Sequence, residues 1–68
     1  MKLSARNKLA GTVVAIHRGE AIANVELEVA GMRLVSSITV EAVEELGLEP
    51  GREVVAVIKA SDVIVGVP

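Results

Sequence analysis

The chain contains nothing that could cross-link a small fold: among its 68 residues there is no cysteine and only one histidine, His17. A disulfide is therefore impossible, and a structural zinc site, which needs four cysteine or histidine ligands, is excluded as well. A domain this short buries only about 60 % of the surface that its unfolded chain exposes, so it is marginally stable alone. Association with further subunits is the remaining means of stabilisation.

The abundance of apolar side chains leads to the same expectation. Hydrophobic residues make up 51 % of the chain, and the mean hydropathy is +0.56. One small core cannot hide that many apolar side chains, so part of the apolar surface should face another subunit. We therefore expect a homo-oligomer, although composition does not give the number of its subunits.

Charge and hydropathy patterning exclude several classes of partner. The net charge is −2, so the chain has no overall positive field that would attract a nucleic acid or an acidic membrane. Charged residues interrupt every apolar run well before the ~20 residues that a membrane helix requires. The N-terminal residues also lack the apolar run of a signal peptide. We expect no nucleic acid, no membrane span and a cytoplasmic location.

The absence of aromatic residues restricts the type of ligand. The chain has no Phe, Tyr or Trp, so it offers no ring on which a base, a pterin or a flavin could stack. Binding of a planar ligand is therefore disfavoured. A compact ligand held by hydrogen bonds and charge is compatible with this composition.

The apolar periodicity predicts five strands. We expect them over residues 9–18, 21–30, 32–38, 53–58 and 63–67. The first is apolar on both faces, which predicts burial on both. The second alternates apolar residues with Asn24, Glu26 and Glu28, so one of its faces should be solvated. In the third, Met32, Leu34 and Ile38 share one face and Arg33 lies on the other.

The period changes to that of a helix after the third strand. Thr39 is a suitable N-cap for a short helix over Val40–Leu46. Gly47 occupies the position of a C′ glycine, and Leu48 can make the hydrophobic contact of a Schellman ending. Pro50-Gly51 then predicts a type II turn into the fourth strand.

Five strands with one short helix between the third and the fourth are the element order of the OB-fold. We therefore expect an all-β fold, a small five-stranded Greek-key barrel with an OB-like topology. Barrel closure would also hide the edges of a valine-rich sheet. The chain contains no linker, repeat or low-complexity tract, so residues 1–68 are interpreted as a single domain.

Two short segments combine the groups that bind a small oxyanion. They are Ser4-Ala5-Arg6-Asn7 near the N-terminus and Lys59-Ala60-Ser61 after the fourth strand. Together they offer hydroxyls, an amide, backbone N–H groups and two cationic side chains, all of which donate hydrogen bonds to an anion. Without further information, the favoured interpretation of Arg6 and Lys59 is that they are ordinary solvated charges.

Three blocks of the sequence resemble one family along nearly the whole chain. SARNKLAGTVVAI at the start, ITVEAVEELGLEPGREV around the helix and VIKASDVIV near the end are similar to the molbindins, or Mop proteins, which are small molybdate-binding proteins. The same module occurs in molybdate-responsive regulators and transporter ATPases. The resemblance implies an OB-like barrel that assembles as a hexamer, a trimer of dimers. It also implies that molybdate or tungstate is held between subunits.

The resemblance also implies roles for individual residues. Ser4, the backbone N–H of Ala5 and Arg6 would contact the oxyanion, and Lys59 with the backbone or hydroxyl groups of Ala60 and Ser61 would contribute as well. Thr39, at the start of the helix, is a further candidate, and Asn7 either serves a second type of site or holds a turn. Ala42 stands where relatives often carry serine, and Ala60 stands where some relatives do. These two departures remove hydroxyls that could strengthen binding.

Three functions are compatible with these observations. The first is the binding and intracellular storage of molybdate by a non-catalytic protein with no cofactor or resident metal. The second is a ligand-sensing or dimerisation module of a regulator or transporter ATPase, although a chain that runs from Met1 to the last strand favours a free-standing protein. The third, an enzyme, is disfavoured because one histidine and no cysteine supply no nucleophile with its base. His17, Glu26 and Glu28 are interpreted as solvated surface residues.

Overall fold

The structure, a computed structural model, describes residues 1–68. It contains four strands, one α-helix and one 3-10 turn. In chain order they are β1 (Asn7–Arg18), β2 (Ile22–Val29), β3 (Met32–Thr39), α1 (Val40–Glu45), β4 (Glu53–Ile58) and η1 (Ala60–Asp62). The expected all-β class, with a short helix between the third and fourth strands, is confirmed. The first three strands differ from expectation only by one or two residues at their ends, and the fourth has the expected bounds.

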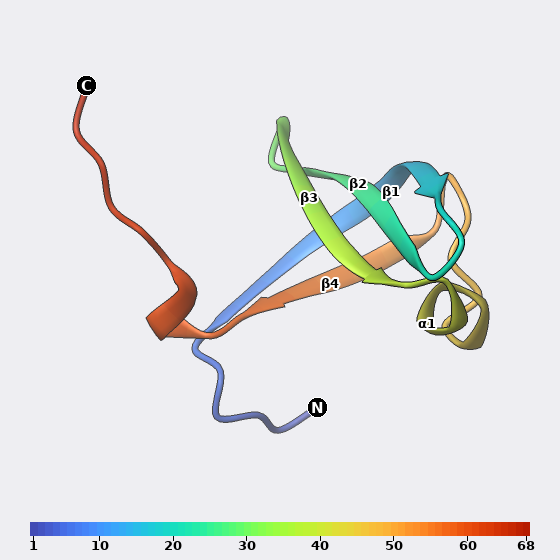
Figure 1. Cartoon of the computed structure of the whole chain (residues 1–68). Helices are drawn as coiled ribbons and strands as arrows, with labels where there is room; N and C mark the ends of the chain where they lie inside the picture. The colour runs from blue at the N-terminus through green and yellow to red at the C-terminus, as the bar shows by residue number, and fades with distance from the viewer.

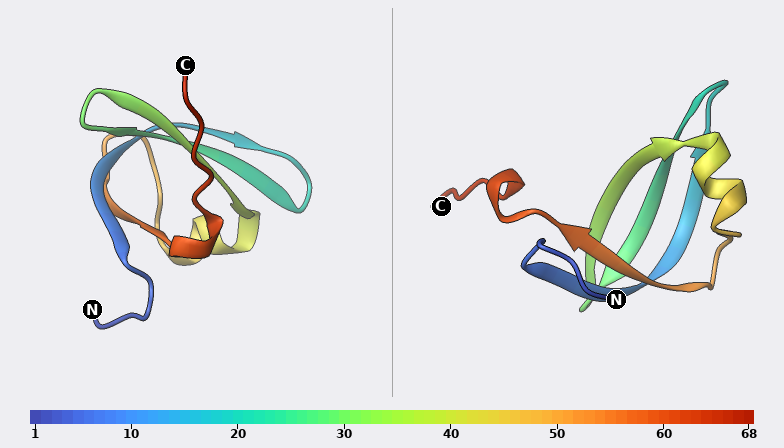
Figure 2. Two further views of the ribbon diagram at one scale, coloured as in Figure 1. Left: turned by 90° about the vertical axis from the view of Figure 1, so that its left-hand side faces the viewer. Right: turned by 90° about the horizontal axis from the view of Figure 1, so that it is seen from below.

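The four strands form one antiparallel sheet in the order β3-β2-β1-β4. β1 connects the two halves of the sheet, because its first half pairs with β4 and its second half pairs with β2. Thr12 is the residue at which the two ladders meet, opposite both Glu28 and Glu53. The sheet therefore curls into an incomplete barrel with α1 at one end (Figures 1 and 2).

Two local features allow β1 to bend between its partners. At Gly11 a β-carbon would lie 2.8 Å from the backbone oxygen of Glu28, so only glycine permits this close approach. The register with β2 then shifts between Val13 and Ala15. The shift is a β-bulge at Val14, which increases the local twist.

The two ends of α1 form largely as the sequence predicts. The helix begins at Val40, and the hydroxyl oxygen of Thr39 accepts a hydrogen bond of 3.0 Å from the backbone N–H of Ala42. It ends at Glu45, one residue earlier than expected. Gly47 has a φ of 63°, and its N–H and that of Leu48 donate to Glu44 and Val43, the bond pattern of a Schellman motif.

The turn before β4 also agrees with expectation. Gly51 has a φ of 94°, which is the backbone conformation required at the third position of a type II turn. The N–H of Arg52 donates to the carbonyl of Glu49 over 3.1 Å and closes the turn. The N–H of Gly51 in turn donates to the carbonyl of Val13, which fixes the turn against β1.

The core is small and is formed mainly by β2. Only five residues are buried: Val13, Ala23, Val25, Leu27 and Val43. The alternation expected for the second strand is confirmed by the three core residues that it supplies. The burial expected on both faces of the first strand is wrong, because Val14 at the bulge is 54 % exposed. Met32 is likewise 68 % exposed, since it follows the hairpin turn directly.

The expected fifth strand does not form in the single chain. After η1 the residues Val63–Val67 run away from the barrel without a strand partner (Figure 2), and Ile64 is 94 % exposed. The outer edges of β3 and β4 both remain unpaired. A groove of about 390 Å³ touches both strands, and twelve of its thirteen lining residues are hydrophobic, with Ser36 as the exception. The barrel is thus open where a fifth strand would complete it.

The helix should contribute to stability mainly through Val43, which is completely buried. We expect Val43→Ala to lower the free energy of unfolding by about 2 kcal/mol, because the variant loses apolar contacts and leaves a cavity. Urea denaturation at a fixed protein concentration measures this change. Glu44→Ala on the exposed side of the same helix is the control, with an expected change within about 0.5 kcal/mol.

Candidate functional site

The pairing of β1 with β4 brings the two predicted donor segments together. The last pair of this ladder is Asn7 opposite Ile58. Arg6 and Lys59 are the next residues beyond that pair, so they lie at the same end of the barrel. Figure 1 shows the start of β1 and the end of β4 meeting at this end, away from α1. Segments that are distant in sequence therefore become neighbours through one strand register.

Cationic residues are concentrated at this end. Strand alternation places Arg6 and Lys8 on the same face of the sheet. Val57 lies on this face too, because it pairs with Lys8. Continuation of the register by one pair would set Arg6 opposite Lys59. All three cationic residues are exposed. Like charges directly opposite one another are unfavourable in a sheet, so an anion between them would relieve the repulsion.

Backbone donors accompany these cations. In η1 the N–H of Asp62 donates to the carbonyl of Lys59 over 2.9 Å. This is the first hydrogen bond of the turn, so the preceding N–H groups of Ala60 and Ser61 have no partner within it. Both residues are exposed. On the other segment Ser4 is exposed and Ala5 is half-buried, before the first residue of β1.

Asn7 connects the two segments directly. Its side-chain nitrogen Nδ2 donates a hydrogen bond of 3.1 Å to the carbonyl oxygen of Ile58, in a partly buried position. Ile58 is the residue immediately before Lys59. The Asn7 amide therefore joins the two segments, while its role as part of a second type of site stays a prediction.

Thr39 lies apart from the other predicted site residues. It pairs with Ile22 at the end of β3, beside the helix that it caps. This is the opposite end of the barrel from Asn7 and Ile58, as Figure 1 shows from the positions of α1 and η1. Within one chain the structure thus brings together Ser4–Asn7 and Lys59–Ser61 and does not bring Thr39 to them.

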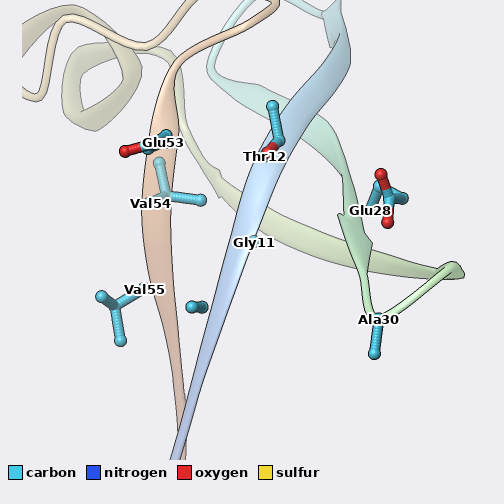
Figure 3. Close-up of a pocket in the computed structure, with 8 residues that line it drawn as sticks. Gly11, Thr12, Glu28, Ala30, Glu53, Val54 and Val55 are labelled. Carbon is cyan, nitrogen blue, oxygen red and sulfur yellow. The ribbon is translucent and has the colours of Figure 1, made fainter.

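The largest hollow of the surface has the wrong charge for an anion. It has a volume of about 590 Å³ and lies where β1 passes from β2 to β4. Glu28 and Glu53 lie on either side of it, next to Gly11 and Thr12 (Figure 3). No cationic residue lines it. Two carboxylates would repel an oxyanion, so the size of the hollow does not make it the binding site.

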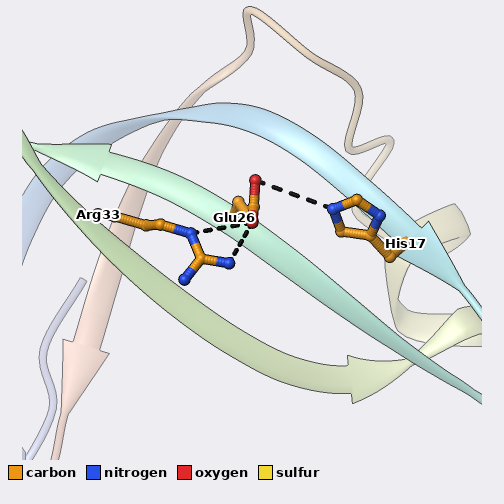
Figure 4. A network of polar contacts seen from close by, with 3 residues as sticks. All are labelled: His17, Glu26 and Arg33. Atoms are coloured by element: carbon orange, nitrogen blue, oxygen red, sulfur yellow. Dashed lines mark hydrogen bonds and ion pairs between the residues drawn. The ribbon is translucent and has the colours of Figure 1, made fainter.

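A polar cluster on the sheet joins three strands, as Figure 4 shows. The guanidinium of Arg33 on β3 donates to Glu26 on β2 through Nε, over 2.9 Å, and through Nη2. The Nε2 atom of His17 on β1 lies 3.8 Å from the other carboxylate oxygen of Glu26. The hydrogen bond from Arg33 lowers the pKa of Glu26; the charges of Arg33 and His17 act in the same direction, while burial opposes them.

Sequence reasoning placed these residues on the solvated surface but did not predict their pairing. His17 is indeed exposed. The strand boundaries held only part of the signal, because a hairpin centred on Ala30-Gly31 sets Arg33 opposite Glu28, with Glu26 as its diagonal neighbour on β2. The structure contains no group of three or more metal-ligating residues. None of its helices has the length and apolar character needed to cross a bilayer.

Comparisons with known proteins agree on one family. A family model described as TOBE domain matches residues 3–65. A protein of Haemophilus influenzae named probable molybdenum-pterin-binding protein is 48 % identical over 68 residues, which cover 98 % of this chain and 99 % of the relative.

Solved structures give the same result. A molybdate binding protein from Sporomusa ovata is 42 % identical and superposes with a TM-score of 0.92, covering 96 % of this chain and 97 % of that one. The molybdate-bound structure of the cytoplasmic molybdate-binding protein ModG is 54 % identical with a TM-score of 0.95. The match covers 100 % of this chain and 49 % of the ModG chain.

The Glu26 cluster generates a prediction on acid stability. Because the pKa of Glu26 is lower in the folded protein than in the unfolded chain, the stabilisation is fully present above the unfolded pKa. It is lost as the pH falls through the folded pKa. We expect Arg33→Ala to reduce the free energy of unfolding at neutral pH, and the difference from wild type to shrink on acidification. Denaturation between pH 7 and pH 3 tests this, with the exposed Arg18→Ala as the control.

Proposed function

The chain belongs to the molbindin (Mop) group of TOBE domain proteins, and we propose that it binds and stores molybdate as a free oxyanion. The observation that carries this proposal is the meeting of Ser4–Asn7 and Lys59–Ser61 at one end of the barrel. The relatives named above that match this chain over nearly their whole length include a protein described as molybdate binding. We infer that the ligand sites form between subunits of a homo-oligomer.

The chemistry of the two segments suits a tetrahedral dianion. Arg6 and Lys59 would neutralise its charge, and the guanidinium can donate two parallel hydrogen bonds. The hydroxyls of Ser4 and Ser61 and the backbone N–H groups nearby would fill the remaining directions around its four oxygens. The site is solvent-exposed in the single chain, so a second subunit is needed to exclude water and to strengthen these interactions.

Ligand selection follows from size and charge. Sulfate is smaller and holds its hydration shell more tightly, so we expect it to bind less well than molybdate. Tungstate has nearly the same size and shape, and the residues present offer no means of rejecting it. A pterin is disfavoured, because the chain has no aromatic residue and the apolar groove contains Ser36 as its single polar side chain.

The open groove suggests how subunits associate. We propose that Val63–Val67 of one copy pairs between β3 and β4 of a second copy, with the exchange made in both directions. Five residues in an extended strand span about 17 Å, close to the length of the six-residue β4. The apolar residues of the tail would cover the apolar lining of the groove. A hexamer, built as a trimer of such dimers, remains the expected assembly.

Assembly would also explain the remote position of Thr39. Because it lies at the opposite end of its own barrel, any contact between Thr39 and the oxyanion must come from another copy. We propose a non-catalytic role, with no cofactor, in the cytoplasm, where ModG is described to act. The alternative is a sensing or dimerisation module of a longer protein, and it is compatible with the match of this chain to about half of the ModG chain.

The ligand assignment predicts the effect of removing either cation. We expect Arg6→Ala and Lys59→Ala each to raise the dissociation constant for molybdate by about 10- to 100-fold, as for the loss of a charge-assisted hydrogen bond. Titration calorimetry on protein of known mass measures this, with sulfate as competitor. Arg52→Ala, an exposed cation in the turn before β4, should bind like the wild type. Unchanged affinity in both site variants would refute the assignment.

The proposed exchange predicts the effect of a charge in the tail. We expect Val65→Asp to reduce the mass measured by light scattering and to abolish molybdate binding, because a carboxylate would have to enter the apolar groove. Pro68→Ser, beyond the pairing residues, should leave both properties unchanged. A Val65→Asp protein that keeps the wild-type mass would contradict the exchange.

A further inference from the structure

We propose that Asn7 is a positioning residue of the oxyanion site, which fixes the separation of Arg6 and Lys59 without contacting the ligand. This inference rests on the proposed function. Its starting point is the hydrogen bond of 3.1 Å from Asn7 Nδ2 to the carbonyl oxygen of Ile58. Asn7 directly follows Arg6, and Ile58 directly precedes Lys59, so the bond joins the immediate neighbours of the two cations.

No other side chain performs this connection. The remaining side-chain hydrogen bonds of the structure join residues three or seven positions apart, whereas Asn7 and Ile58 are 51 positions apart. The bond closes the last pair of the β1–β4 ladder. Strand ends fray in the absence of such a restraint. The Asn7 amide therefore restrains the point from which both site segments leave the sheet.

The orientation of Asn7 argues against direct contact with the anion. Side chains alternate along β1, so Asn7 lies on the opposite face from Arg6 and Lys8. Asn7 and Ile58 are both half-buried, while the two cations are exposed. The bond to Ile58 uses one of the two N–H groups of Nδ2, which leaves a single N–H donor and the carbonyl Oδ1. That atom only accepts hydrogen bonds, as does a molybdate oxygen.

A restraint at this position has an energetic purpose. Arg6 and Lys59 carry like charges at adjacent strand ends, and in the empty site their repulsion would push the ends apart. Part of the binding free energy would then be spent on drawing the two strand ends together again. A side chain that keeps the ends at a fixed separation reduces this cost, which is the general benefit of a preorganised site.

The test compares Asn7→Ala with Asn24→Ala, an exposed asparagine on β2 whose side chain makes no hydrogen bond. We expect Asn7→Ala to weaken molybdate binding about five-fold, the loss typical of one net hydrogen bond, while the assembly keeps its mass. In the ligand-free protein, amide hydrogen exchange should accelerate at Asp62 and Val63, whose N–H groups donate to the carbonyls of Lys59 and Ala60, and remain unchanged in α1. Saturating molybdate should restore the protection. Asn24→Ala should match the wild type in both measurements.

Each other outcome has a defined meaning. Unchanged affinity in Asn7→Ala, with wild-type binding intact, overturns the positioning role and leaves the proposed function standing. A loss beyond 100-fold without faster exchange at Asp62 and Val63 also overturns it, because Asn7 would then be a direct ligand. Faster exchange in α1 as well would assign Asn7 a merely structural role. Failure of the wild-type protein to bind molybdate overturns the proposed function and this inference together.

Discussion

The fold depends on the shared pairing of β1. One strand carries two ladders, and they meet at Thr12, which faces Glu28 on one side and Glu53 on the other. Gly11 and the bulge at Val14 permit the bend that this requires. The bend separates the two ends of the molecule, with the helix at one and the charged segments at the other. Both the incomplete barrel and the placement of the candidate site follow from this arrangement.

The candidate site shows how a chain without aromatic residues can still recognise a ligand. Stacking is unavailable, and the core offers no buried polar group. Recognition at the proposed site would therefore rely on charge, hydroxyls and backbone N–H groups at the chain segments that flank β1 and β4. The interactions that such groups make with a ligand are weak when water surrounds them and stronger when water is excluded. The same exposed segments that leave the single chain incomplete are thus those from which an assembled site would be built.

Local sequence patterns predicted most of the secondary structure. Thr39 and Gly47 act as helix caps, and Gly51 takes the backbone conformation that its turn requires. The alternation in β2 correctly identified the core face. Each of these features is decided by residues within a few positions of one another, so a pattern in the sequence is sufficient to find it.

Features that depend on distant residues were not predictable in the same way. The bulge at Val14 arises from the register between β1 and β2, and the Asn7 bond to Ile58 arises from the register with β4. The strand pattern of Val63–Val67 is present in the sequence, but a strand also needs a partner edge, and in the single chain this segment runs away from the open edges of β3 and β4. The sequence alone suggests the two donor segments of the proposed site, because their chemistry is local, whereas the distance of Thr39 from them required the topology.

The open side of the barrel would couple molybdate binding to subunit association. If subunit exchange completes the site, molybdate binds assembled protein better than free subunits, and mass action then requires that molybdate also favours assembly. The capacity of the store would rise more steeply than the protein concentration, because doubling the number of chains also increases the fraction that is assembled. A cell could then release bound molybdate by diluting or degrading the protein, with no change in the binding residues themselves.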